Sequence, residues 1–162
     1  MKKYFTSLFI VSFLILIAGS MNAQGRVGKI FSDSGAKILF GKVISSVDIT
    51  VEDLREAVSN AGDYVYITIK NNQPVLTNVK RQSLIKRLYV PPMGKDEKMI
   101  LFSKNAVEDF LNQISSTGRT DVKNARVNAA AAVSVERRGA TTTLSANGYT
   151  LEMALGCPPF CN

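Results

Sequence analysis

Apolar and polar positions alternate along the chain in a way that predicts several strands and two helices. The clearest strand is Tyr64 to Lys70 (YVYITIK), where successive residues fall on opposite faces. Residues 71–74 are typical of a turn, so Val75 to Val79 returns as the partner strand. Other apolar or alternating runs predict strands at 36–44, 84–90, 99–102, 127–135, 140–145 and 149–155.

Helical spacing of apolar residues predicts one helix over residues 51–61 and a second over 107–114. Thr50, with an acidic residue three positions later, forms an imperfect capping box for the first helix. Asn105 or Ser103 caps the second helix. Both helices end before a glycine, which is typical of helix C-termini.

The segment 121–136 fits two structures. Its alanine run at 129–132 suits a helix, because alanine has the highest helix propensity. Alternation that starts at Val127 favours a strand, and we prefer that interpretation. Further on, Asn147 and Gly148 tolerate the positive φ of a type I′ turn, so they predict a tight hairpin.

These elements predict an α+β fold with a mixed or antiparallel sheet of about six to eight strands covered by the two helices. Residues 36–162 form this single domain, and it ends in a C-terminal cysteine loop. The stretches 38–62 and 100–118 resemble each other, with Val-Glu-Asp and a closing glycine in both. A degenerate internal duplication explains the resemblance, and so do features that all helices favour.

The first 23 residues have the pattern of a bacterial secretory signal peptide. Lys2 and Lys3 precede an apolar run over 8–18, and small or polar residues follow as far as Ala23. The alternative, an uncleaved anchor, is disfavoured because a bilayer span needs about 20 apolar residues. We therefore expect residues 24–35 to form a flexible N-terminal segment of an exported protein, periplasmic or extracellular, whose mature chain has no transmembrane span.

The composition excludes most catalytic chemistry. The chain of 162 residues contains no histidine, which removes Ser-His and Cys-His catalysis and histidine metal sites. It also has no nucleophile elbow, P-loop, dinucleotide fingerprint or EF-hand loop. We therefore expect no enzymatic activity, no cofactor and no metal. The net charge of +7 favours acidic partners without requiring them.

Two cysteines, Cys157 and Cys161, lie near the C-terminus. In an exported protein such a pair predicts a disulfide, which would fasten the tail after the last strand. Two alternatives are a redox-active pair and a soft-metal site that adds Met153 or Met99. The spacing is not the C-x-x-C of thioredoxin-like motifs, which argues against redox chemistry.

Basic residues are densest over residues 80–87. The candidate anion-binding residues are Lys70, Lys80, Arg81, Lys86 and Arg87. Arginine side chains beside tyrosines can bind phosphate or acidic sugars. One hypothesis is therefore that this group binds an anionic polymer or a membrane surface. The alternative, which we favour, is that such residues on an edge strand only prevent pairing between sheets.

Three tyrosines form a candidate binding face: Tyr64, Tyr66 and Tyr89. Tyr64 and Tyr66 share one face of the clearest predicted strand. Exposed, they would offer a binding surface. Such a face more often packs against a helix, and we favour this interpretation for the two residues.

Together these patterns predict a small exported module of the bacterial envelope or exterior that binds or interacts without catalysis. Its partner is an unknown protein or polymer of that compartment, or an anionic surface. The alternatives are a thiol redox or soft-metal protein using Cys157 and Cys161, and a binder of anionic polymer or membrane through residues 80–87.

Overall fold

The computed structural model describes residues 26–40, 43–91, 99–116, 122–131, 140–152 and 155–157. The elements in chain order are β1 (Lys29–Ser32), α2 (Asp33–Phe40), β2 (Val43–Thr50), α3 (Val51–Asn60), β3 (Tyr64–Lys70), β4 (Gln73–Thr77), β5 (Met99–Ser103), α4 (Lys104–Ser116), β6 (Asn124–Ala131), β7 (Ala140–Ala146), β8 (Tyr149–Glu152) and β9 (Leu155–Cys157). The predicted signal peptide, residues 1–23, lies outside the described residues. Within them, no helix is long and apolar enough to cross a membrane.

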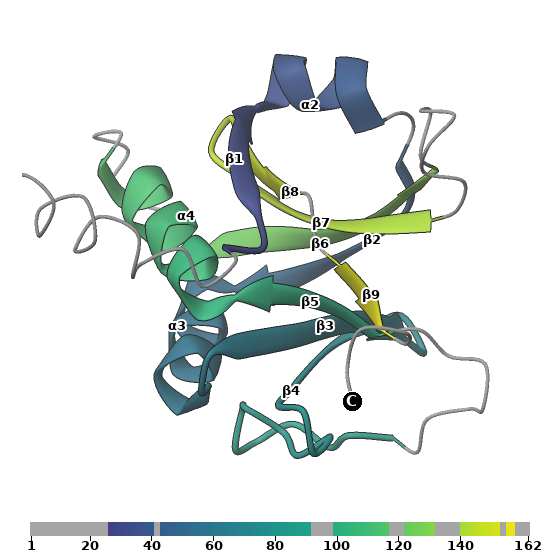
Figure 1. The fold of residues 1–162 in the computed structure, drawn as a ribbon, viewed down its shortest axis with the longest axis vertical. Helices are drawn as coiled ribbons and strands as arrows, with labels where there is room; N and C mark the ends of the chain where they lie inside the picture. Colours follow the sequence, from purple (N-terminus) through teal and green to yellow (C-terminus); the bar gives the residue numbers. More distant parts are fainter. Residues whose placement is uncertain are drawn as a thin grey trace, which may run out of the picture.

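The strands form two antiparallel sheets. One has the order β1-β8-β7-β6-β2, and the other has the order β4-β3-β5-β9. Figure 1 shows the five-stranded sheet above the four-stranded sheet, with α3 and α4 together at one side of both. The α+β class is therefore confirmed. The single sheet expected from the sequence is replaced by two sheets, and α3 and α4 do not clearly cover either one.

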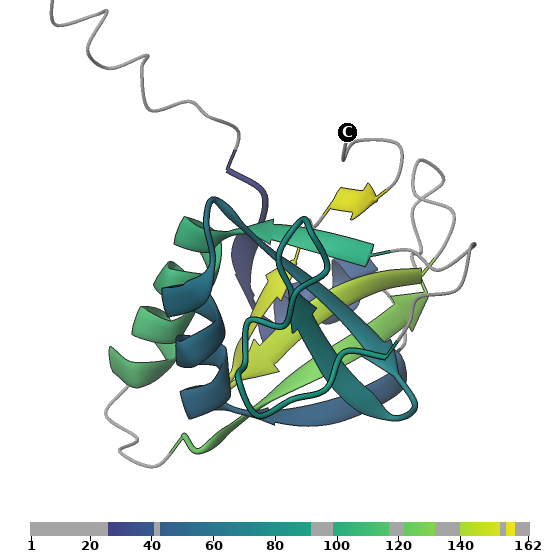
Figure 2. The ribbon, with the colours of Figure 1, turned by 90° about the horizontal axis from the view of Figure 1, so that it is seen from below.

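The hydrophobic core lies between the two sheets and is closed at one end by α3 and α4. The core side chains include Val47, Ile49, Val127, Leu144 and Leu151 from the five-stranded sheet, Val65, Ile67, Leu76 and Phe102 from the four-stranded sheet, and Leu54, Phe110 and Ile114 from the helices. Burial of each such side chain contributes about 1.5–3 kcal/mol. Figure 2 shows the helices flanking the stacked sheets from a second direction.

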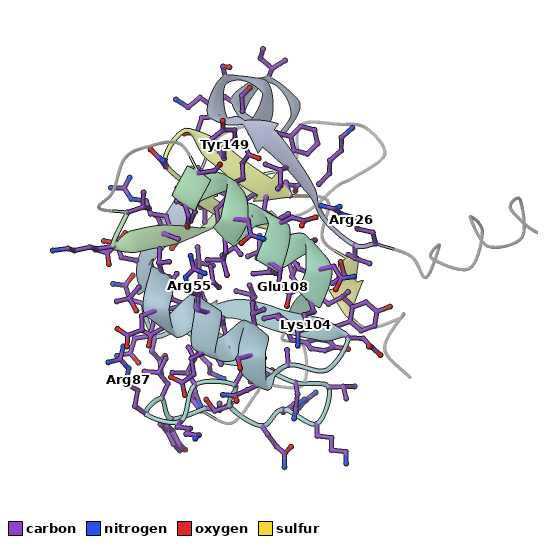
Figure 3. All side chains as sticks on the ribbon, turned by 90° about the vertical axis from the view of Figure 1, so that its left-hand side faces the viewer. Arg26, Arg55, Arg87, Lys104, Glu108 and Tyr149 are labelled. Carbon is purple, nitrogen blue, oxygen red and sulfur yellow. The ribbon has the colours of Figure 1, made fainter. Side chains whose placement is uncertain are left out.

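The two predicted helices are confirmed. The helix predicted over 51–61 is α3, and the helix predicted over 107–114 lies within α4. Thr50 has extended backbone, and its Oγ1 accepts a hydrogen bond of 3.0 Å from the Asp53 amide, which is an N-cap. Arg55 Nη2 donates to Ser115 Oγ over 2.9 Å and links the two helices. Arg55 is labelled in Figure 3. The relative position of α3 and α4 is therefore set by this polar contact as well as by apolar packing in the core.

Several predicted strands are also confirmed. The segment 121–136, which fitted a helix or a strand, contains β6 over Asn124–Ala131. Asn147 and Gly148 have φ values of 51° and 83° in the turn between β7 and β8. Both positive values are those that the predicted I′ hairpin requires.

The strand expected over 36–44 is wrong for residues 36–40, whereas residues 43–44 do lie in β2, and regular structure begins earlier than the sequence suggested. Residues 29–32 form β1, and residues 33–40 form α2. Ser32 caps this helix, because its Oγ accepts a hydrogen bond of 3.3 Å from the Gly35 amide. A short continuous apolar run does not distinguish a strand from a buried helix, which explains the error over 36–40.

Two other predicted strands are corrected. Residues 84–90 form no strand, and only an isolated bridge joins Thr77 to Ser83. The expected last strand divides into β8 and β9, which belong to different sheets. In the suggested duplication, residues 38–40 end α2 whereas residues 100–102 lie in β5, so only the helical parts correspond. The duplication itself stays a prediction.

Candidate functional site

The five-stranded sheet has one apolar face and one polar face. Successive residues of a strand point to opposite sides, and here the apolar residues of β2, β6, β7 and β8 point into the core. By the same alternation, the other face carries Ser46, Asp48, Arg126, Asn128, Thr143, Ser145, Thr150 and Glu152. Helix α2 crosses over this polar face (Figure 1). The polar side chains therefore lie beneath a helix.

Strand register places these polar residues directly beside one another. Asp48 pairs with Arg126, Arg126 with Ser145, and Ser145 with Thr150. Residues opposite each other in an antiparallel pair have Cβ atoms about 4.5–5.5 Å apart. One continuous polar row therefore runs across four strands, β2, β6, β7 and β8.

A second row is organised by Asn128. This residue pairs with Ser46 on one side and with Thr143 on the other. Its Nδ2 donates to Thr143 Oγ1 over 3.2 Å and to Ser145 Oγ over 2.8 Å. Because Asn128 supplies the hydrogen in both bonds, each hydroxyl keeps its own hydrogen to donate. Asn128 thus orients two hydroxyl groups side by side.

Helix α2 is attached to this face through its first residue. The Asp33 amide donates to Gly148 O over 2.9 Å, and Thr150 Oγ1 donates to Asp33 Oδ1 over 2.8 Å. β1 and β2 are the two edges of the sheet, so the helix that connects them must cross its width. Ala36, buried, is the small residue that α2 places over the strands.

A cavity of about 330 Å³ lies between α2 and the sheet. Its volume falls within the range of about 300–1,000 Å³ that is typical of small-ligand sites. We call it the polar cup, and its lining residues are Asp33, Ala36, Lys37, Val43, Ser46, Arg126, Asn128, Thr143, Ser145 and Thr150. Five of these side chains carry an uncharged hydroxyl or amide group, which makes hydrogen bonding the main chemistry available.

A second cavity, of about 410 Å³, adjoins the polar cup. It is lined by Ser46, Val47, Asp48, Asn72 and Arg126, and we call it the edge cavity because β2 is an edge strand. Ser46 and Arg126 line both cavities. The two cavities therefore share a boundary.

Among the residues that line the two cavities, cationic and anionic side chains are equal in number. Lys37 and Arg126 are cationic, and Asp33 and Asp48 are anionic. Arg126 Nε lies 3.4 Å from Asp48 Oδ1, and both side chains are about two-thirds exposed. Such an exposed pair contributes little to stability. Among the described residues, no cluster of three or more potential metal ligands occurs.

The predicted basic group falls mainly in a loop that is held against α3. Arg87 Nη2 lies 2.6 Å from Asp53 Oδ2 and also contacts Oδ1. The Lys86 amide donates to Glu56 Oε1 over 3.0 Å, and Asn60 Nδ2 donates to Leu84 O over 2.9 Å. The Asp53 hydrogen bond raises the pKa of Arg87. The charge of Arg87 is therefore used to hold the loop to the helix.

The rest of this loop is closed on itself by Asn78. Its Oδ1 accepts hydrogen bonds from the amides of Lys80 (2.9 Å) and Gln82 (3.0 Å). Lys80 and Arg81 are exposed, and Arg81 has a φ of 61°. Lys70 lies at the turn of the β3–β4 hairpin. The loop begins after Thr77, at the opposite end of this hairpin. The structure therefore spreads the basic residues over two places.

The three candidate tyrosines have very different environments. Tyr66 is 5% exposed and Tyr64 is 37% exposed, whereas Tyr89 is 78% exposed. Burial raises the pKa of the Tyr66 hydroxyl, and nearby Tyr64 raises it further. Tyr66 is therefore inaccessible to a ligand in this state. Cys161 lies outside the described residues, and only the backbone of Cys157 is described, in β9.

Sequence reasoning missed the polar cup. Alternating serines, threonines and asparagines on β6 and β7 resemble the solvent-facing side of any strand. The assignment of residues 36–44 to a strand also removed α2, which forms the other wall. The available signal was the density of hydroxyl residues over 141–145, TTTLS. No family model, curated protein or solved structure matches this chain.

Proposed function

We propose that the protein is an exported, non-catalytic binding module whose ligand occupies the polar cup. One observation carries the proposal: α2 covers the polar face of the five-stranded sheet, and a cavity of about 330 Å³ lies between them. Asn128, Thr143 and Thr150 are buried on this face, yet they are polar. Hydrogen bonds from Asn128 to Thr143 and from Thr150 to Asp33 offset the cost of burying these groups, and they hold a hydrogen-bonding surface in place beneath α2. The leader-like first 23 residues support export.

The ligand that fits this lining best is a neutral saccharide. The hydroxyls of Thr143 and Ser145 can donate, and Asp33 can accept beyond its bond to Thr150, because a carboxylate has about four acceptor positions. Sugar hydroxyls both donate and accept, so they complement such a mixture. The balanced charges disfavour a strongly anionic or cationic ligand. Ala36 and Val43 supply apolar surface for the C–H groups of a sugar ring.

The same groups support binding without hydrolysis. Glycoside hydrolysis requires one carboxylic acid that donates a proton and a second carboxylate across the bond. Asp33 accepts from Thr150 and Asp48 lies beside Arg126, so the two carboxylates that line the cavities are each held by a partner in the protein.

The test is a glycan array of neutral oligosaccharides built from glucose, galactose, mannose and N-acetylglucosamine, probed with the mature chain. The best binder is then titrated by calorimetry against the unmodified protein and Ser145→Ala. Ser145 lines the polar cup, whereas the matched control, Ser116→Ala, removes a hydroxyl that donates to Gln113 O on α4.

We expect at least one neutral glycan to bind, and Ser145→Ala to weaken that binding about tenfold, since one hydrogen bond contributes about 0.5–1.5 kcal/mol and 1.4 kcal/mol is tenfold. Ser116→Ala should bind like the unmodified protein. Binding only to anionic glycans, or to none, would overturn the saccharide assignment. Equal affinities for the Ser145 variant and the unmodified protein would remove the polar cup as the site.

A further inference from the structure

We infer that the ligand is an extended oligosaccharide that leaves the polar cup across β2 and enters the edge cavity, where Asn72 contacts it. This inference rests on the proposed function and specifies the size of its ligand. It assigns separate roles to the two cavities. The polar cup holds the first sugar units, and the edge cavity holds the units that follow.

Continuity between the cavities supports an extended ligand. Ser46 and Arg126 line both, so the two cavities meet at these two side chains. Both residues lie on the polar face, in strands that pair directly with each other. Ser46 is exposed, and its small side chain leaves the passage open. A chain of sugar units that fills the polar cup can therefore extend past Ser46 and Arg126, over the edge strand, to the edge cavity.

Arg126 and Asp48 lie where the two cavities meet, and their charged groups can form further hydrogen bonds. The 3.4 Å contact between Arg126 Nε and Asp48 Oδ1 engages one of the five N–H donors of the guanidinium. Exposed ion pairs of this kind are weak, so either partner can turn to a ligand at small cost. Together they supply a donor and an acceptor side by side, which matches adjacent sugar hydroxyls.

Asn72 reaches the edge cavity from the other sheet. It lies in the turn between β3 and β4 with a φ of 58°, next to Asn71 with a φ of 50°. Glycine meets both positive φ values at least as well, so the turn does not require an amide side chain. Of this pair, only Asn72 lines the edge cavity. The two residues therefore form a natural comparison between a turn residue and a contact residue.

A neutral peptide is the alternative extended ligand. The described lining residues of both cavities include no aromatic side chain and only Ala36, Val43 and Val47 as apolar ones. Extended peptides gain specificity from pockets for alternate side chains. The shallow set of small apolar residues offers few such contacts, and the hydroxyl-rich lining favours a sugar chain.

The experiment measures affinity against chain length. The neutral glycan series that binds best on the array is titrated from the monosaccharide to the hexasaccharide, with the unmodified protein, Asn72→Gly and Asn71→Gly. We expect affinity to rise with length and then level off. Asn72→Gly should weaken binding of the hexasaccharide several-fold and leave the shortest binding member unchanged, while Asn71→Gly should change neither. Thermal melting of both glycine variants establishes that the turn is intact.

The outcomes separate this inference from the proposed function. Equal affinity for the monosaccharide and the hexasaccharide, with Ser145→Ala still weakening both, would overturn the extended ligand and leave the polar cup as a site for one sugar. An equal loss in Asn71→Gly and Asn72→Gly would assign the effect to the turn and overturn the role of Asn72. Binding of a neutral peptide library in place of every glycan would overturn both proposals.

Discussion

The two faces of the five-stranded sheet are made by the same strands and have opposite chemistry. On one face, Val127 and Leu144 are fully buried in the core between the sheets. On the other, their neighbours Asn128 and Thr143 are joined by a hydrogen bond beside the polar cup. Adjacent positions therefore separate two tasks. The apolar face supplies stability, and the polar face is available for recognition.

The largest expected effect is on the apolar face. Leu144→Ala removes a side chain that is 0% exposed, so it should lower the free energy of unfolding by about 2–5 kcal/mol. Thr143→Val keeps the shape of the adjacent residue and removes its hydroxyl, which should cost about 1 kcal/mol. Urea denaturation of both variants measures the contrast. Equal losses at the two positions would contradict the division between the faces.

The next largest effect is expected from blocking the polar face without touching the core. Ser46→Trp places a large side chain at the boundary of the two cavities, and should weaken glycan binding by at least about 100-fold, or roughly 2.7 kcal/mol. Ser46 is exposed, so stability should change by no more than about 0.5 kcal/mol. Calorimetry and urea denaturation give the two readouts, with Ser116→Trp as the control. Full-strength binding by the Ser46 variant would place the ligand elsewhere.

A smaller effect should separate polar residues that hold structure from those of the polar cup. Arg87→Met removes the contact with Asp53 that holds the loop against α3. We expect faster hydrogen exchange at the amides of Leu84 and Leu88, which bond to Leu76 O and Ile85 O, and unchanged glycan affinity. Hydrogen exchange read by mass spectrometry checks the loop. Loss of glycan binding in this variant would indicate that the basic loop is part of the binding site.

The smallest expected effect concerns the buried hydroxyl of Tyr66 and appears only at alkaline pH. Its pKa is raised above the ordinary value of about 10 by burial, so the unfolded chain ionises first as pH increases. The unfolded state then binds fewer protons than the folded state, and stability falls as pH rises above about 10. Tyr66→Phe should therefore lose less stability than the unmodified protein between pH 9 and pH 11. Parallel pH profiles in urea denaturation would contradict this account.

Local patterns predicted those elements whose determinants are close in sequence. Thr50 and the Asp53 amide form a cap within one turn, and β3 shows its alternation directly. The position of α2, by contrast, depends on Thr150, which contacts Asp33 across 117 residues. The polar cup likewise requires the register of β2, β6, β7 and β8. Individual residue types in those strands indicate a solvent-facing side, and only their pairing beneath a helix makes a cavity.

The most direct test of the central claim is a crystal structure of residues 24–162 with the neutral oligosaccharide that binds best on the array. We predict sugar density in the polar cup, with hydroxyl groups in hydrogen-bond contact with Asn128 or Ser145 and the chain continuing past Ser46. Sugar density confined to the loop around Lys80 and Arg81, or to the outer face of β3, would contradict the account.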